Sequence, residues 1–308
     1  MTTKMICGLV AALALVPATA SAKTHVAVGL GDQHASTFSA PAFRALHVKK
    51  ARYFIRWDAA KVPSALAAAD EYVRAARAAH VRVLLHFSTN NFGHKKARLP
   101  SVRSYRKWVG RLVRHYRKLG VRDFGVWNEE NHVSQPTYKN ARRAASYYRT
   151  MRSICHHCTI VALDVLDQRG VQGYIGRWFR ALPRSYRHKK LIIGIHNYSD
   201  TNRRRSRGTS RIIRTTRHYD RHAQFWLTET GGVVNFGRSF PCNEKRAASR
   251  ISYMFKLARK FRHNIKRLYA FSWSGSDCQG FDAGLVRMNG TLRPGYRTFK
   301  SQARHFTR

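Results

Sequence analysis

The sequence predicts a single (β/α)8 barrel, and two observations support this prediction. Short runs rich in β-branched and aromatic residues recur along the chain, and each is followed by a segment with helical periodicity. This alternation is typical of parallel strands joined by helices, and eight such pairs fit one barrel domain of about 250 residues. An open doubly wound sheet is the alternative, but no Gly-rich phosphate-binding loop follows the first strand.

Each element has its own signal in the sequence. Pro63 begins one helix, where the missing N–H of proline costs nothing, and Leu66, Val73 and Ala76 share the buried face of that helix. Further amphipathic helices are predicted over Ser104–Leu119, Ala141–Ile154 and Glu244–Phe261. The predicted strands are His25–Leu30, Ala51–Trp57, Val81–Phe87, Asp123–Trp127, Cys158–Leu163, Lys190–His196, Ala223–Glu229 and Leu268–Trp273.

Residues 1–22 have the features of an export signal. Lys4 precedes an apolar stretch from Met5 to Val16, and Ala20-Ser21-Ala22 has the small-residue pattern of a cleavage site. The stretch is too short for a membrane span, and no later segment approaches the roughly 20 apolar residues that a span requires. We therefore expect a secreted or envelope-associated protein whose catalytic domain comprises residues 23–308.

Polar and aromatic residues stand at the carboxyl ends of the predicted strands, where barrel enzymes place their catalytic groups. The chain has only five glutamates, yet Glu129 and Glu229 both end apolar strands. Packing alone would favour aliphatic residues there, so we expect a site with paired carboxylates. The other strand ends are Gly31-Asp32, Arg56-Trp57, His86, Asp164, His196-Asn197-Tyr198 and Trp273-Ser274.

These positions resemble the retaining (β/α)8 glycoside hydrolases known as clan A, over about residues 31–296. That superfamily places an acid/base glutamate after an asparagine at strand 4 and a nucleophilic glutamate at strand 7, which correspond to Asn128, Glu129 and Glu229. The Trp127-Asn128-Glu129 stretch is most similar to family 39-like or family 5-like enzymes, although Glu130 replaces the proline usual in family 39. The supporting positions that match are Arg56, His196, Tyr198 and Trp273.

The resemblance implies a role for each of these residues in cleaving O-glycosidic bonds. A retaining glycosidase needs two carboxyl groups about 5 Å apart, one as nucleophile and one as acid and then base. Glu229 would be the nucleophile, with Arg56 and the Tyr198 hydroxyl stabilising its charge. Glu129 would be the acid/base, with a pKa raised by burial and by the charge of Glu229. Asn128 would bind the sugar 2-hydroxyl, His196 would contact the substrate, and Trp273 would stack on a sugar ring.

Several residues have structural alternatives. A strand register shifted by one residue would make Glu130 the acid and turn Glu129 away from the barrel axis. Trp273 could belong to the core, and His86 and His196 could be hydrogen-bonded core histidines. Asp167 could be a surface loop residue.

Cys7 lies in the export signal, which leaves Cys155, Cys158, Cys242 and Cys278 for an oxidising compartment. Cys155-His156-His157-Cys158 has zinc-ligand residue types, but its close spacing is poorly suited to a tetrahedral site. We favour a local disulfide there and a second bridge between Cys242 and Cys278, although the sequence allows three pairings. Neither a metal nor a cofactor is expected.

The net charge is +43, from 58 Lys and Arg against 15 Asp and Glu. This favours anionic partners such as an acidic carbohydrate. Two loops could hold one, with the basic residues Arg203, Arg204, Arg205 and Arg207 after strand 6 and His94, Lys95, Lys96 and Arg98 after strand 3. General basic bias is the alternative, because Lys and Arg cover every predicted helix. No nucleic-acid-binding motif is recognisable. Besides a hydrolase, we consider an inactive barrel that binds glycans and a basic envelope-binding or nucleic-acid-binding protein.

Overall fold

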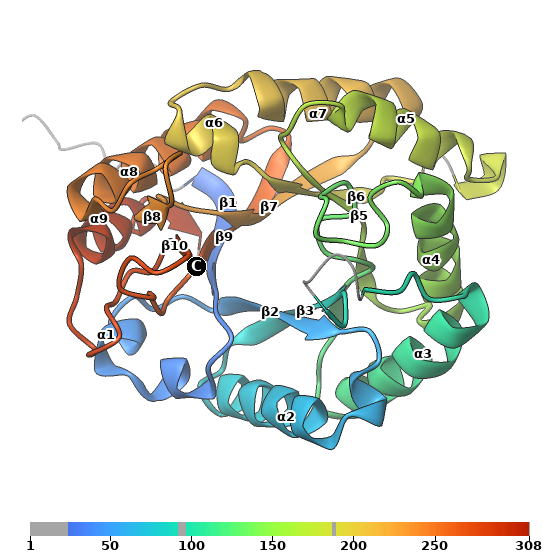
Figure 1. Ribbon diagram of the computed structural model, residues 1–308, viewed down its shortest axis with the longest axis horizontal. Helices are drawn as coiled ribbons and strands as arrows, with labels where there is room; N and C mark the ends of the chain where they lie inside the picture. The colour runs from blue at the N-terminus through green and yellow to red at the C-terminus, as the bar shows by residue number, and fades with distance from the viewer. Residues whose placement is uncertain (1–23, 92–96, 187–188, 308) are drawn as a thin grey trace, which may run out of the picture.

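The computed structural model describes residues 24–91, 97–186 and 189–307, so the export signal predicted over residues 1–22 lies outside it. Eight parallel strands form a closed barrel, in which each strand pairs with the next and the last pairs with the first (Figure 1). The prediction of a (β/α)8 barrel is therefore confirmed. The barrel strands are β1 (Thr24–Gly31), β2 (Lys50–Arg56), β3 (Arg82–Ser88), β4 (Asp123–Gly125), β5 (Thr159–Leu166), β6 (Ile192–His196), β7 (Gln224–Thr230) and β9 (Ile265–Phe271).

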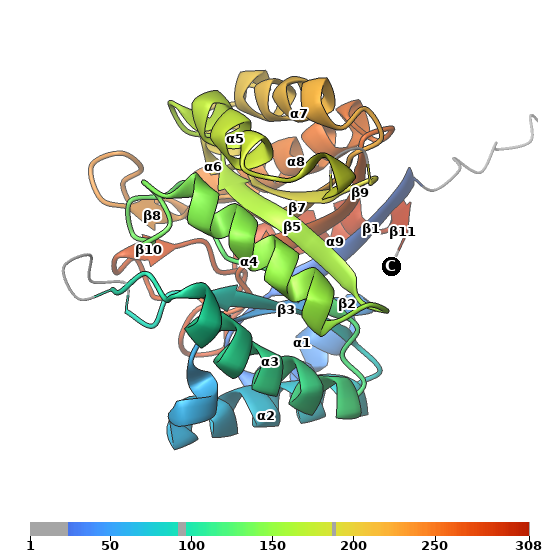
Figure 2. The same ribbon diagram turned by 90° about the vertical axis from the view of Figure 1, so that its right-hand side faces the viewer.

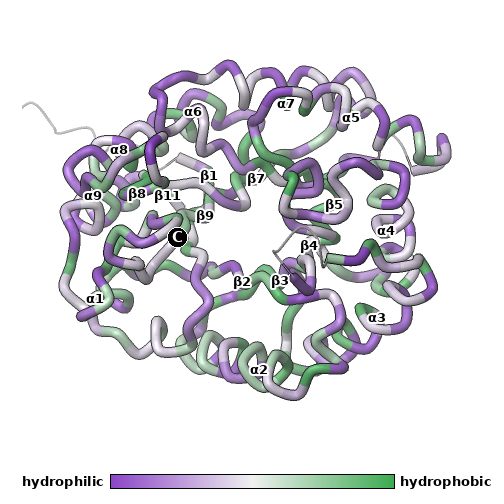
Figure 3. The backbone as a smooth tube through the Cα atoms, in the orientation of Figure 1, coloured by the Kyte–Doolittle hydropathy of each residue, from purple (hydrophilic) through white to green (hydrophobic). Residues whose placement is uncertain are grey.

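Helices cover the outside of the barrel, as the two perpendicular views show (Figures 1 and 2). Apolar residues gather on strands such as β3 and β7, and the outer ring is more hydrophilic (Figure 3). Among the described residues, no helix has the length and apolar character needed to cross a membrane. The helices are α1 (Pro41–Arg44), α2 (Pro63–Ala78), α3 (Val102–Lys118), α4 (Ala141–Ile154), α5 (Val171–Arg180), α6 (Tyr198–Asn202), α7 (Arg207–Tyr219), α8 (Glu244–Lys260) and α9 (Pro294–Ala303).

The inside of the barrel changes from apolar to polar along its axis. Leu84, Val161, Trp226 and Tyr269 come from β3, β5, β7 and β9 and form a small apolar cluster of their own, as side chains do in the packed interior of a barrel. Further along the same strands, the buried side chains include His86 and Asp164. The barrel therefore has an apolar layer below and a polar layer near the carboxyl ends of its strands.

Two glycines make room for this polar layer. A Cβ atom at Gly125 on β4 would lie 2.0 Å from the ring of His86, and one at Gly194 on β6 would lie 2.1 Å from Oδ2 of Asp164. Both separations are far below van der Waals contact, so any larger residue would displace the buried polar groups.

An irregularity in β7 sets the direction of Glu229. Between Trp226 and Glu229 this strand has one residue more than β6 has between Gly194 and His196. Side chains normally alternate between the two faces of a strand, and an extra residue breaks that alternation and redirects a side chain. Thr228 and Glu229 can therefore both contact the barrel interior, although they are adjacent in sequence.

A short antiparallel sheet stands above the barrel, formed by β8 (Asn235–Phe236) and β10 (Phe281–Asp282). The Cys242–Cys278 disulfide joins the loops that carry its two strands. Beside it, the buried Arg293 guanidinium donates to both carboxylate oxygens of Asp282, at 2.7 and 2.8 Å.

The other predicted disulfide, Cys155–Cys158, is also present and lies just before β5. One further strand, β11 (Phe306–Thr307), pairs with β1.

Candidate active site

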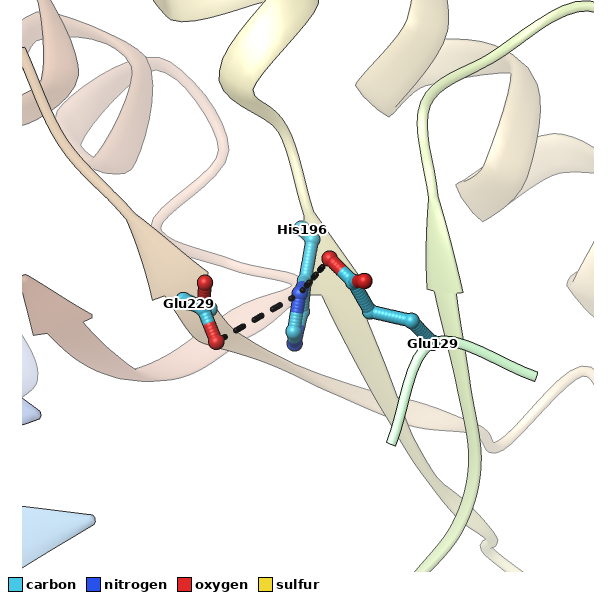
Figure 4. Close-up of side chains that lie close together, drawn as sticks. All are labelled: Glu129, His196 and Glu229. Atoms are coloured by element: carbon cyan, nitrogen blue, oxygen red, sulfur yellow. Dashed lines mark hydrogen bonds and ion pairs between the residues drawn. The ribbon is translucent and has the colours of Figure 1, made fainter. Parts of the chain in front are cut away.

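Glu129 and Glu229 come together at the carboxyl end of the barrel. Glu129 follows β4, Glu229 lies in β7, and a carboxylate oxygen of each lies within 4.8 Å of the other and of the His196 imidazole. Figure 4 shows both carboxylates directed toward the ring of His196, which comes from β6. Their side chains are 16% and 9% exposed, so both are largely shielded and still accessible to a ligand.

Arg52 and Tyr198 hold the Glu229 carboxylate. Nη1 of Arg52 lies 2.6 Å from one carboxylate oxygen, and the Tyr198 hydroxyl donates to the other at 3.0 Å. The Arg52 side chain is only 1% exposed, so this ion pair lies in a medium that screens charge weakly. Its Nη2 also donates to Oδ1 of Asn128, which fixes the asparagine beside the two glutamates. These contacts fix the position of the Glu229 carboxylate.

The prediction that Arg56 would neutralise Glu229 is wrong. Arg56 pairs instead with Asp58, at 2.6 Å. Arg52 and Arg56 point to the same face of β2, but four residues of strand separate them by about 13 Å. Arg52 therefore reaches the level of the glutamates, and Arg56 lies nearer the rim. The run Ala51–Trp57 contains both arginines, so the sequence offered no signal that separates Arg52 from Arg56.

His86 is neutral and orients Arg52. Burial is the largest cause that lowers the pKa of His86; Asp164 raises it, but the charges of Arg52 and His196 add to burial and bring it to about 3. Nε of Arg52 donates to Nδ1 of His86 at 3.3 Å, so Nε2 carries the proton and donates to the Trp127 carbonyl at 3.2 Å. His86 is thus a hydrogen-bonded core histidine that also supports the site.

His196 carries a positive charge between acidic groups. Burial lowers its pKa, but the charges of Asp164 and Glu229 and the hydrogen bonds to Asp164 and Glu129 outweigh burial and raise it to about 10. The protonated ring donates from Nδ1 to Glu129 at 2.9 Å and from Nε2 to Asp164 at 2.9 Å. The ring lies between the two glutamates, but it is fully buried and does not line the cavity, so it holds Glu129 and does not make the substrate contact predicted for it.

Asp164, like Arg52, is a site residue that sequence reasoning missed. It was recognised only as a strand end, yet it is fully buried and accepts the backbone N–H of Glu129 at 3.1 Å and the Thr228 hydroxyl at 2.5 Å. Burial raises its pKa, but His196, His86 and Arg52 together lower it far below its usual range. Asp164 therefore remains ionised and joins β5 to the elements that carry the other site residues.

The backbone of Glu129 adopts a strained conformation. Its φ of 49° lies in the left-handed region, which costs a non-glycine residue about 1–2 kcal/mol. Such residues persist where surrounding contacts fix them, often at functional sites. The bond from its N–H to Asp164 is one such contact.

Glu130 points away from the cavity, so the alternative strand register is wrong. Its side chain is fully buried, and neither carboxylate oxygen has a hydrogen-bond partner among the described residues. Burial and the charge of Asp164 raise the pKa of Glu130 well above its usual range. It is therefore an uncharged core residue, whereas Glu129 lines the cavity.

A cavity of about 790 Å³ opens above the two glutamates. Asn128, Glu129, Tyr198 and Glu229 contribute to its lining, and phenylalanines form much of the rest. Arg169, Arg203 and Arg205 line it from the loops after β5 and β6.

Trp273 does not line this cavity, so its predicted stacking role is wrong. The side chain is 6% exposed and packs edge-on against Phe43 and Tyr296 in the core. Strand β9 ends at Phe271, two residues before the predicted end, and Phe271 is the residue that faces the cavity.

Asp167 lies at the cavity rim and is not an exposed loop residue. It is 7% exposed and accepts the backbone N–H groups of Ser199 and Asp200, at 3.1 and 2.6 Å. Burial and the charge of Asp200 raise the pKa of Asp167 to about 7. Asp167 thereby anchors the first turn of α6, the short helix that carries Tyr198.

The predicted basic loops contribute only in part. Arg203 and Arg205 line the cavity, but Arg204 turns away and lies over the ring of Tyr253. His94, Lys95 and Lys96 lie outside the described residues.

Glu129, His196 and Glu229 also have the spacing required of three metal ligands. Each is already engaged: both ring nitrogens of His196 donate to carboxylates, and Arg52 and Tyr198 hold Glu229. We therefore assign none of the three as a metal ligand.

No family model matches the chain, and neither does any curated protein sequence. Solved structures match it in fold. A psychrophilic glycoside hydrolase family 10 endo-β-1,4-xylanase has 13% sequence identity and a TM-score of 0.64, over 89% of this chain and 96% of the other. An intracellular xylanase from Thermoanaerobacterium saccharolyticum, in complex with xylotriose, has 11% identity and a TM-score of 0.61, over 92% and 99% of the two chains.

A family 113 β-1,4-mannanase gives 13% identity and a TM-score of 0.57, again over 92% of this chain and 99% of the other. At these identities the likeness concerns the fold alone. The resemblance to the retaining (β/α)8 glycoside hydrolases is thus confirmed as one of fold, and the matches single out no one family among them.

Proposed function

We propose that this protein is a retaining glycoside hydrolase in which Glu229 is the nucleophile and Glu129 the acid/base. The observation that supports this best is the separation of their carboxylate oxygens, which is no more than 4.8 Å. Retaining enzymes hold the two carboxyl groups about 5–5.5 Å apart, whereas inverting enzymes need about 6.5–9.5 Å to admit a water molecule.

In the first step, a carboxylate oxygen of Glu229 attacks the anomeric carbon. The glycosidic C–O bond breaks, and the departing oxygen takes a proton from Glu129. Arg52 and Tyr198 hold the Glu229 carboxylate in place for this attack. The product is a glycosyl ester on Glu229 and a free alcohol.

In the second step, Glu129 removes a proton from water, and the water oxygen attacks the same anomeric carbon. The ester bond breaks and returns Glu229 as a carboxylate. His196 holds a proton at Nδ1, 2.9 Å from Glu129, so the acid/base has a proton donor beside it throughout the cycle. Asp164 stabilises the imidazolium form of His196 from the other side of the ring.

The proposed substrate is a polysaccharide or glycoside, which needs no cofactor for this chemistry. Asn128 lines the cavity with Oδ1 occupied by Arg52, so its amide Nδ2 is the group that faces a sugar hydroxyl. An inactive glycan-binding barrel would not require Arg52, Tyr198, His196 and Asp164 to converge on the two glutamates. We also propose export from the cell, supported by residues 1–22 and by the two disulfides.

Glycan hydrolysis by three glutamine variants tests the proposal. Glu229→Gln and Glu129→Gln should each lower kcat/KM on a responsive β-glycan by at least about 10³-fold, because each removes one half of the mechanism. Glu130→Gln is the matched control and should remain within a few-fold of the wild type, because its carboxyl is buried and uncharged. Full activity in either of the first two variants, with all three folded, would remove the assignment.

A further inference from the structure

The cavity above the glutamates has two walls of opposite character. Its apolar wall consists of phenylalanines from several elements. Phe54 and Phe271 lie 6.3 Å apart between ring centroids, Phe271 and Phe281 6.4 Å, and Phe281 and Phe236 5.7 Å. Phe281 also packs edge-on against Tyr198, the partner of Glu229, at 5.2 Å. The aromatic wall therefore continues down to the nucleophile.

This wall remains partly exposed although the protein has a large core. Phe236 is 54% and Phe281 38% exposed, and they are directly paired across the β8–β10 sheet. The Cys242–Cys278 disulfide and the ion pair of Arg293 with Asp282 hold that sheet in place. Exposed aromatic rings that are held in a fixed position are suited to stacking against the apolar face of a sugar ring.

The other wall is cationic. Arg169 and Arg203 both line the cavity, and within residues 24–91, 97–186 and 189–307 neither forms an ion pair with an acidic residue. Arg205 stands beside them and reaches Asp200 at 3.5 Å. Arg203 also lies over the ring of Phe240, 5.0 Å from its centroid, so the cationic and aromatic walls meet at that point.

We infer that the site takes a glycan with an anionic group on the ring that lies between these walls. Guanidinium groups bind carboxylate and sulfate through paired N–H donors, and the phenylalanines bind the apolar face of the same sugar. This inference rests on the proposed function for its location, but it concerns binding and can be tested without turnover.

The net charge of +43 makes non-specific attraction to any polyanion the main competing explanation. Arg111 and Arg114 supply a matched control, since both are exposed on α3, and neither lines the cavity. Replacing that pair removes the same charge as replacing Arg169 and Arg203, but it leaves the cavity unchanged.

The test measures affinity by calorimetry in the Glu229→Gln background, at about 0.15 M salt, where exposed charges more than about 8 Å apart are screened. The probes are a β-linked oligosaccharide containing glucuronic acid, the same oligosaccharide with its carboxyl groups reduced to alcohols, and a sulfated oligosaccharide of equal charge. We expect the acidic forms to bind at least about tenfold more tightly than the reduced form. Whichever of the two acidic probes binds more tightly identifies carboxylate or sulfate as the preferred group.

Arg169→Gln with Arg203→Gln should remove that preference, and Arg111→Gln with Arg114→Gln should retain it. Phe236→Ala should lower the affinity for the acidic and the reduced probes by the same factor and leave the ratio of these affinities unchanged.

Equal affinity for acidic and reduced probes, or an equal loss of affinity in the two arginine double variants, would overturn the inference. If the wild type cleaves the neutral probe and shows no acidic preference, the inference fails while the hydrolase proposal stands. If the acidic preference depends on Arg169 and Arg203 but the wild type cleaves none of the probes, the inference stands and the hydrolase proposal loses its support.

Discussion

Arg52 donates hydrogen bonds to three site residues through one guanidinium group: Glu229, Asn128 and His86. Because it is buried, its loss would remove the guanidinium that pairs with Glu229 in a weakly screening environment. Arg56 offers a matched comparison on the same face of the same strand.

We expect Arg52→Met to lower kcat/KM by at least about 100-fold, which corresponds to about 3 kcal/mol of transition-state stabilisation. It should also lower the free energy of unfolding by about 3–5 kcal/mol, the usual cost of breaking a buried ion pair. Arg56→Gln should change both quantities little. Steady-state kinetics and urea unfolding of the two variants measure kcat/KM and the free energy of unfolding. An equal loss of activity in both variants would show that Arg56 also belongs to the site.

Asp164 gives a pH-dependent prediction. His196 has a folded-state pKa of about 10, above its ordinary value of 6.5, so its charged contacts stabilise the fold fully below pH 6.5. That contribution is lost as the pH rises from 6.5 through 10. The charged groups facing this ring are Asp164, Glu129, Glu229 and Arg52.

Asp164→Asn keeps the shape of the side chain and removes the charge that contributes most to raising the pKa of His196. The decline in the free energy of unfolding between pH 6.5 and pH 10 should therefore be smaller in the variant than in the wild type. Urea unfolding at several pH values measures this slope. Parallel slopes in the two proteins would show that Asp164 does not hold the proton on His196.

At the scale of elements, the β8–β10 sheet depends on contacts distant in sequence. The Cys242–Cys278 disulfide spans 36 residues, whereas Cys155–Cys158 spans three. The chain-entropy model gives a stabilisation of about 4 kcal/mol for the longer loop and about 2 kcal/mol for the shorter.

We expect Cys242→Ser with Cys278→Ser to lower the free energy of unfolding by about 4 kcal/mol and to raise KM, because the sheet carries Phe236 and Phe281 into the cavity. Cys155→Ser with Cys158→Ser should cost about half as much stability and leave KM unchanged, because that bridge lies just before β5. Chemical unfolding and glycan kinetics measure both effects. A KM unaffected by loss of the longer bridge would show that the sheet keeps its position without it.

At the scale of the whole molecule, the alternation of strands and helices was sufficient to predict the barrel, because each pattern extends over many residues. The positions of Glu129 and Glu229 followed from the rule that catalytic groups lie at the carboxyl ends of barrel strands. Depth along a strand was not predictable in the same way. Arg52 and Arg56 share a face, and only the three-dimensional register shows which of them is level with Glu229.

Local irregularities account for the other differences. The extra residue in β7 lets Thr228 and Glu229 face the interior together, which a strict alternation of side chains does not allow. The end of β9 at Phe271 leaves Trp273 in the core and gives the cavity a phenylalanine in its place. Asp164 escaped notice because its role depends on contacts with β4, β6 and β7 that no single segment reveals.

In the proposed mechanism, Glu229 forms a covalent bond to the sugar. In a 2-deoxy-2-fluoro aryl glycoside, the fluorine slows both steps of the reaction. A good leaving group restores the rate of the first step only, so the glycosyl ester should accumulate. Intact-mass analysis of the protein after incubation with a series of such glycosides should show one added glycosyl group, and peptide mapping should locate it on Glu229. An inverted anomeric product, or a label on Glu129 or elsewhere, would contradict the account.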